Sequence, residues 1–165
     1  MDIQEVLEKV KESKVFKEFH EEHKGYYLTH FFSMIAKGEQ SPWQVGFYSK
    51  KSDKIVVFEL DKEVIKHEEE DVFKKQKTVK ELKLKDIMPF EEAIEKAEAY
   101  RKANHSAEIE QQKICILQNI GLGTVWNITI ISMQFNMLNL KMRASDGHIL
   151  KHSFDSILRL GKDKV

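Results

Sequence analysis

Five side chains of this chain are well suited to contact a ligand: Tyr26, Tyr27, His30, Trp43 and Trp126. Such rings join a large apolar surface to a hydrogen-bonding edge, a combination that binding sites use. Three of them share one aromatic-rich segment, and each tryptophan begins a run of strand-forming residues. They predict a pocket between helix and sheet, if the fold brings these runs together. The alternative is that the two indoles pack against helices in the core.

Other reactive side chains do not form a recognisable catalytic or metal-binding set. His20 and His23 are three residues apart with carboxylates between them, but no third ligand is evident. Cys115 lies in an apolar run, which favours a buried and inert thiol. Lys74, Lys75 and Lys77 follow an acidic run that offsets their charge. We therefore predict a protein that is not an enzyme and has no metal and no cofactor.

The overall composition limits the classes of partner and compartment. The chain has 165 residues, 41% of them hydrophobic, and a formal net charge of zero. This balance argues against a nucleic-acid partner, which requires surplus positive charge. The N-terminus lacks the pattern of a signal peptide, and no apolar run reaches the length of a membrane span. With only one cysteine, the sequence predicts a cytoplasmic protein with no membrane partner.

Hydrophobic spacing predicts the secondary structure. Residues 2–23 read as a helix that Ser13 interrupts, and residues 89–104 read as the clearest helix. Residues 26–36 suit a buried strand, although their periodicity alone also allows a helix. Further predicted strands cover residues 43–48, 55–60, 113–119, 125–134 and 138–144, with a short last strand at 148–150. Asp146-Gly147 is a strong hairpin turn between the last two strands.

An apparent internal repeat predicts the architecture. Glu5–Val10 reads almost as Glu92–Ala97, and Trp43 corresponds to Trp126, 83 residues later. A repeat of this length suggests two copies of a small module. We expect an α+β protein of two repeated modules, each a helix packed on an antiparallel β-meander. The first module covers 1–75, a connector 76–88 and the second module 89–165, together forming one compact unit.

The second half resembles the PepSY domain family. The resemblance rests on the helix Glu91–Asn104, the strand ending in Ile130-Ile131, the alternation of Leu138–Ala144, and the turn segment Arg143–Leu150. It implies tandem PepSY-like modules with a cystatin-like layout, a helix on a curved antiparallel sheet. It also implies a binding or inhibitory role without catalytic residues. The strands led by Trp43 and Trp126 are in addition similar to those of small uncharacterised archaeal proteins.

These observations lead to two hypotheses about function. The first is a non-enzymatic protein that binds a protein or peptide through a sheet edge or through the concave face of the sheet. The same edge would allow pairing with a second copy, giving a homodimer. The alternative is a small-molecule-binding protein or enzyme that uses the helix–sheet pocket around the five side chains named first.

Overall fold

The computed structural model of this protein describes residues 1–71 and 79–162. Its helices are α1 (Ile3–Glu12), α2 (Lys14–Glu22), α3 (Phe90–Asn104) and α4 (Ile157–Lys162). Its strands are β1 (Tyr26–Ala36), β2 (Glu39–Gln40), β3 (Trp43–Ser49), β4 (Lys54–Leu60), β5 (Val64–Lys66), β6 (Glu70–Asp71), β7 (Glu110–Asn119), β8 (Thr124–Ser132), β9 (Asn136–Arg143) and β10 (Ile149–Ser156).

Side-chain caps fix where the first two helices begin. The Asp2 carboxylate accepts the N–H of Gln4 at 3.3 Å, and the Glu5 carboxylate accepts the N–H of Asp2 at 3.2 Å. This reciprocal capping box satisfies amides that have no partner inside α1. Ser13 ends α1 and caps α2 by accepting the N–H of Phe16. The predicted interruption at Ser13 is thereby confirmed.

All strands of the described residues belong to one antiparallel sheet. Its order is β10-β9-β8-β7-β1-β3-β4-β5, with β2 paired to β1 and β6 paired to β4. β1 joins the two halves of the chain. It pairs with β3 from Tyr26 to Phe32 and with β7 from His30 to Ala36. Residues distant in the sequence therefore share one continuous ladder of backbone hydrogen bonds.

The single sheet corrects the predicted architecture. The α+β content is confirmed, but the prediction of two repeated modules, each a helix on its own meander, is wrong. The β1–β7 ladder runs over seven residue pairs, from His30–Gln118 to Ala36–Gln112. A local sequence match reports helix and strand positions, whereas the pairing of distant strands depends on which sheet edges meet on folding. The repeat signal could not supply that information.

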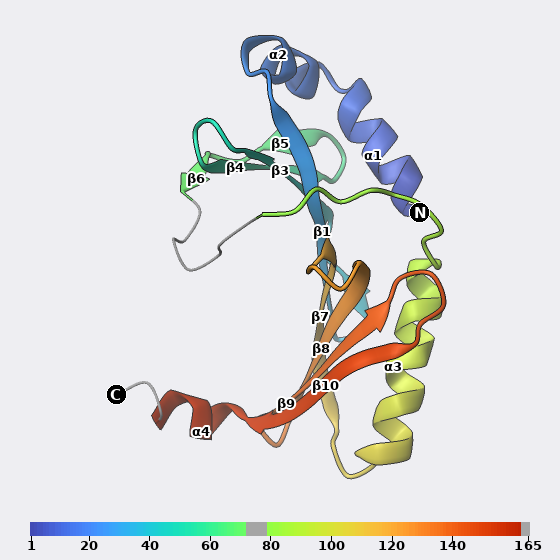
Figure 1. Ribbon diagram of the computed structural model, residues 1–165. Helices are drawn as coiled ribbons and strands as arrows, with labels where there is room; N and C mark the ends of the chain where they lie inside the picture. The colour runs from blue at the N-terminus through green and yellow to red at the C-terminus, as the bar shows by residue number, and fades with distance from the viewer. Residues whose placement is uncertain (72–78, 163–165) are drawn as a thin grey trace.

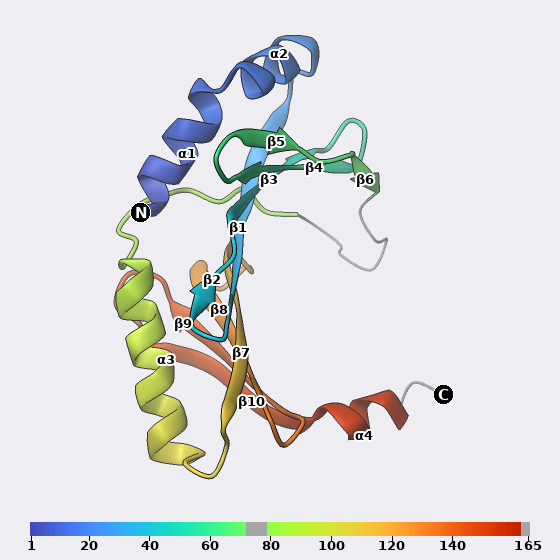
Figure 2. The same ribbon diagram turned by 180° about the vertical axis from the view of Figure 1, so that it is seen from behind.

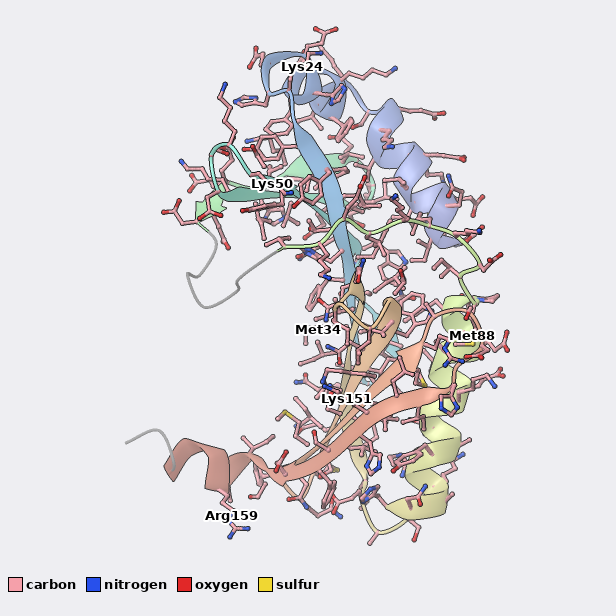
Figure 3. All side chains as sticks on the ribbon, in the orientation of Figure 1. Lys24, Met34, Lys50, Met88, Lys151 and Arg159 are labelled. Carbon is pink, nitrogen blue, oxygen red and sulfur yellow. The ribbon has the colours of Figure 1, made fainter. Side chains whose placement is uncertain are left out.

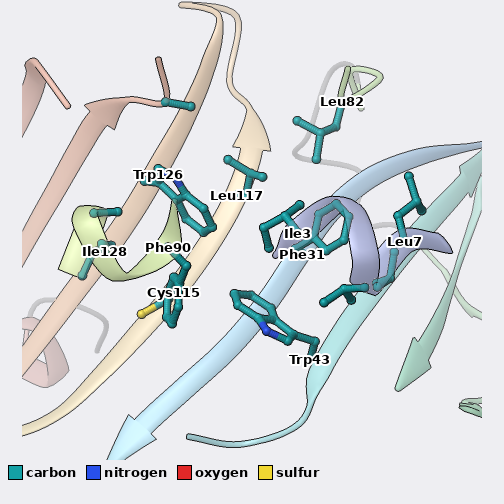
Figure 4. Packing of buried hydrophobic residues seen from close by; sticks show 14 of the residues in the cluster. Ile3, Leu7, Phe31, Trp43, Leu82, Phe90, Cys115, Leu117, Trp126 and Ile128 are labelled. Atoms are coloured by element: carbon teal, nitrogen blue, oxygen red, sulfur yellow. The ribbon is translucent and has the colours of Figure 1, made fainter. Parts of the chain in front are cut away.

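One side of the sheet carries most of the helical structure. Figures 1 and 2 show α1, α2 and α3 on the same side, with α4 projecting from the end of β10. Among the helices of the described residues, none is both long and apolar enough to cross a membrane. The core lies between these three helices and the sheet and includes Ile3, Phe31, Phe90, Leu117 and Ile128 (Figure 4). Its burial is the main stabilising contribution to the fold.

Candidate functional site

The side of the sheet opposite α3 forms a distinct surface, called here the uncovered face. Alternate residues of each strand point to opposite sides, so the neighbours of the core residues face away from the helices. Met34, labelled in Figure 3, lies on this side. The strands β1, β7, β8 and β9 contribute Phe32, Met34, Ile114, Ile116, Asn127, Thr129, Ile131, Met137, Asn139 and Lys141, all half-buried. This surface combines apolar side chains with a few polar ones.

A hydrogen-bonded polar cluster occupies the β8–β9 part of the uncovered face. The Asn139 amide nitrogen donates to Asn127 Oδ1 at 2.7 Å and contacts Thr129 Oγ1 at 2.9 Å. The Lys141 ammonium donates to Asn139 Oδ1 at 2.6 Å. Asn139 thus has both ends of its amide engaged, which fixes its orientation. The Lys141 ammonium has three donors and uses one of them in this bond.

A hollow of about 430 Å³ lies at the β1 end of the same face, beside His30 and Phe32. Gln118 of β7 and Lys80 of the connector also line it. The His30 ring lies across Gly46, where an added Cβ would come within 2.0 Å of His30 Cε1. Thr29 Oγ1 lies 3.0 Å from His30 Nδ1. Burial lowers the pKa of His30 to about 4, so the imidazole is neutral at neutral pH.

The buried His30 predicts a loss of stability in mild acid. An unfolded histidine takes up a proton near pH 6.5, whereas folded His30 does so only near pH 4. Stability should therefore fall as the pH drops through this window, by about 2 kcal/mol from this group. Urea unfolding at about pH 7 and pH 4 should show that His30→Phe removes this part of the loss. An equal loss in the variant and the wild type would contradict the prediction.

A larger hollow, of about 1010 Å³, adjoins the first and is lined by Tyr27, Tyr48, Lys50, Lys51, Val79 and Lys80 among others. Tyr27 donates its hydroxyl hydrogen to the Val79 carbonyl oxygen at 2.5 Å. Tyr48 donates to Asp53 Oδ1 at 2.5 Å, and this bond, followed by burial, raises the pKa of Tyr48 to about 12. Burial and the nearby Glu81 also raise the pKa of Tyr27. Both phenols are therefore neutral hydrogen-bonding groups at physiological pH.

Strand β10 forms one end of the sheet. It pairs with β9 through residues from Ile149 to Ser156, and no described strand lies on its other edge. His152 and Phe154 point to the helix side, since their rings lie 5.8 Å from Tyr100 and 4.3 Å from His105. Lys151, Ser153 and Asp155 therefore continue the uncovered face. The residues from Lys151 to Asp155 are exposed.

The five predicted site residues are separated by the sheet. Trp43 and Trp126 lie in the core on the helix side, with ring centroids 6.4 Å apart, and both pack against Phe90. Tyr26 also faces the helices, where its ring contacts Phe19. Tyr27 and His30 line the two hollows described above. A ligand-binding role for the two buried indoles stays a prediction.

The remaining sequence candidates do not form a site within the described residues. His20 and His23 each stack on a phenylalanine of α2, and no group of three metal-ligating side chains occurs in residues 1–71 and 79–162. Cys115 is fully buried, and burial raises the pKa of its thiol to about 12. The basic run of Lys74, Lys75 and Lys77 lies outside the described residues.

Comparison with known proteins gives the fold and nothing further. No family model matches the chain, and no curated protein matches it. One solved structure, a protein described as a "putative lipoprotein" from Clostridium difficile 630, is similar with a TM-score of 0.57. The chain shares the fold of that protein. The match covers 86% of this chain and 90% of the other at 17% sequence identity. The PepSY resemblance and the cytoplasmic location stay predictions.

Sequence reasoning did not identify Asn139, Lys141 and Lys151 as members of one site. The alternation of Leu138, Leu140 and Met142 with polar residues indicated only that one side of β9 meets water. Lys151 was placed after the end of a short predicted strand. The available signal was the run of hydrogen-bonding side chains at alternate positions of β9, which is more specific than a solvated face requires.

Proposed function

We propose that this protein is a non-enzymatic binding protein that takes up an extended segment of a protein or peptide along strand β10. One observation carries the proposal: β10 is an eight-residue strand at the end of the sheet, with no described strand on its outer edge. The outer backbone groups of such a strand are a template for a further strand. Main-chain hydrogen bonds would supply affinity, and the side chains of β10 and β9 would supply specificity.

The positions of the perturbed ionisable groups favour binding over catalysis. Within the described residues, Cys115 is in the core, Glu98 lies between α3 and β7, and His30 is on the uncovered face. A catalytic site would bring such groups to one open cleft, within hydrogen-bonding reach of a common substrate atom. These three are instead divided between the two sides of the sheet.

Strand addition is testable with two neighbouring proline variants. In an antiparallel strand, the N–H groups of adjacent residues point to opposite edges. Of His152→Pro and Ser153→Pro, one therefore loses a bond to β9 and the other loses only an outward donor. Peptides selected from a displayed random library would be titrated onto both variants. The variant that keeps the wild-type unfolding midpoint should lose at least about tenfold in affinity, because its outward donor no longer reaches the added strand.

Mapping the selected peptides on the isotope-labelled protein completes this test. Amide shifts and slower hydrogen exchange in residues 149–156 would support strand addition. Undiminished binding to the stable proline variant would overturn it, as would shifts confined to other strands. Failure of the library to yield any binding peptide would also count against the proposal.

A second candidate function is small-molecule binding between helix and sheet. A hollow of about 490 Å³ lies there, lined mainly by apolar residues of α1, α2 and β1, with Tyr26, Tyr27 and His20 at its wall. Its volume suits a compact apolar ligand with one or two polar groups. Titration with a fragment library should then shift the amides of Phe19, Tyr26 and Leu82. Shifts restricted to β10 would favour the peptide instead.

A further inference from the structure

Two lysines face each other across the last strand pair. Lys141 of β9 and Lys151 of β10 are register partners. Their side chains share the uncovered face, because the neighbouring pair of Leu140 and His152 points to the helix side. Directly opposed residues in an antiparallel pair have Cβ atoms about 5 Å apart, and two like charges at this separation are destabilising.

The described acidic residues do not neutralise this pair. Neither lysine has a carboxylate oxygen within 4.0 Å in the described part of the chain. Arg143, the next uncovered-face position of β9, is held by Asp146 at 2.8 Å. Asp155 lies four residues along β10 from Lys151, roughly 13 Å away at strand rise. The lysine pair therefore presents positive charge with room for an anionic group.

One of the two ammonium groups is already held in position. Lys141 donates to Asn139 Oδ1 at 2.6 Å, and Asn139 is itself fixed by Asn127 and Thr129. Holding a charged group by neighbouring side chains reduces the entropy that binding must remove. The site has apolar neighbours as well, since Ile131 and Met137 are register partners on the same face. An anion flanked by apolar groups suits this surface better than a free inorganic ion does.

We infer that the segment recognised by β10 carries an acidic side chain, aspartate or glutamate, that seats against Lys141 and Lys151, with apolar residues two positions away on either side. This inference rests on the proposed strand addition. An added strand places one residue directly beside Lys151 on the uncovered face, at the spacing of a cross-strand pair. An acidic residue at that position extends the row from Lys141 through Lys151 and relieves the repulsion between the two ammonium groups.

Three designed peptides of equal length test the inference. They alternate valine with glutamate, with glutamine or with lysine, so that one face of the bound strand changes and the backbone does not. The glutamate peptide should bind at least about tenfold more tightly than the glutamine peptide at low salt, and the advantage should shrink as ionic strength rises. The lysine peptide should bind most weakly. Lys141→Gln and Lys151→Gln should each abolish most of the glutamate preference.

A matched control and the opposing outcomes make the test decisive. Lys102→Gln changes an exposed lysine of α3 on the other side of the sheet and should leave all three affinities unchanged. Equal binding of the glutamate and glutamine peptides at β10 would overturn the acidic specificity and leave strand addition in place. If none of these peptides, and none from the random library, shifts residues 149–156, strand addition itself fails. N-acetylglutamate N-methylamide that binds as tightly as the peptide would replace a peptide partner by a small acid.

Discussion

Lys113→Met should destabilise the protein by roughly 3 kcal/mol or more. Lys113 is 5% exposed on β7, and its ammonium lies 2.9 Å from Glu98 of α3 and also contacts Glu110. Burial alone would lower the pKa of Lys113, but the two carboxylates outweigh it and hold that pKa above its ordinary value. Removing the ammonium leaves two carboxylates facing each other beneath α3. Urea unfolding at neutral pH would measure the loss, and Lys102→Met is the matched control, expected to change stability by less than about 0.5 kcal/mol.

The pH dependence of the same variant identifies the cause. Burial would raise the pKa of Glu98, but hydrogen bonds from Glu110, Lys113 and Arg101 lower it to about 2. Glu98 therefore stabilises the wild type above about pH 4.5, and this contribution is lost as the pH falls toward 2. Burial and Glu98 raise the pKa of Glu110, which acts in the opposite direction. Without Lys113 both pKa values should be raised, so the variant should gain stability on mild acidification.

Two results would contradict this account. One is an unfolding free energy of Lys113→Met that falls with pH as the wild type does. The other is a stability unchanged by the substitution at neutral pH. Adding Glu110→Gln to Lys113→Met should recover part of the loss, because one of the two unpaired carboxylates is then neutral. The recovery separates electrostatic repulsion from the loss of the lysine stem as packing.

The sequence predicted individual elements where residue patterns are local. Ser13 marks the break between α1 and α2 because its side chain serves as a cap. The alternation in β9 is visible because one side of that strand packs on the core. β10 was predicted as three residues and has eight. Its segment from Lys151 to Asp155 is exposed, so an edge strand of this kind carries no hydrophobic alternation that would reveal it.

The candidate site depends on long-range register, which the sequence does not display. The pairing of β10 with β9 shifts between Ile149 and Lys151, and this shift brings Lys151 opposite Lys141. A hairpin drawn directly from the Asp146-Gly147 turn would give another partner, because one residue of slip reverses every side chain. The two tryptophans show the converse case. Their residue type suggested either a ligand site or core packing, and the helix α3 between them and solvent decides their burial.

Trp126 should be the more costly of the two tryptophans to replace. It is fully buried, and its indole N–H donates to the Met88 carbonyl oxygen at 3.1 Å. The N–H of Met88 in turn donates to the Ala144 carbonyl oxygen at 2.7 Å, so both backbone groups of Met88 bind to the sheet. Met88 directly precedes Pro89 and the first turn of α3. Trp126 therefore positions the helix that separates the core from solvent.

Three substitutions measure this role by chemical denaturation. Trp126→Ala should lose about 3–5 kcal/mol through the cavity it leaves. Trp126→Phe keeps an aromatic ring but leaves the Met88 carbonyl unpaired, which should cost about 1–3 kcal/mol more than Trp43→Phe in the same cluster. Trp43 is the matched control, since it also packs on Phe90 and is 6% exposed. Equal losses for the two phenylalanine variants would show that the indole hydrogen bond does not hold α3, and that ring packing alone sets its position on the sheet.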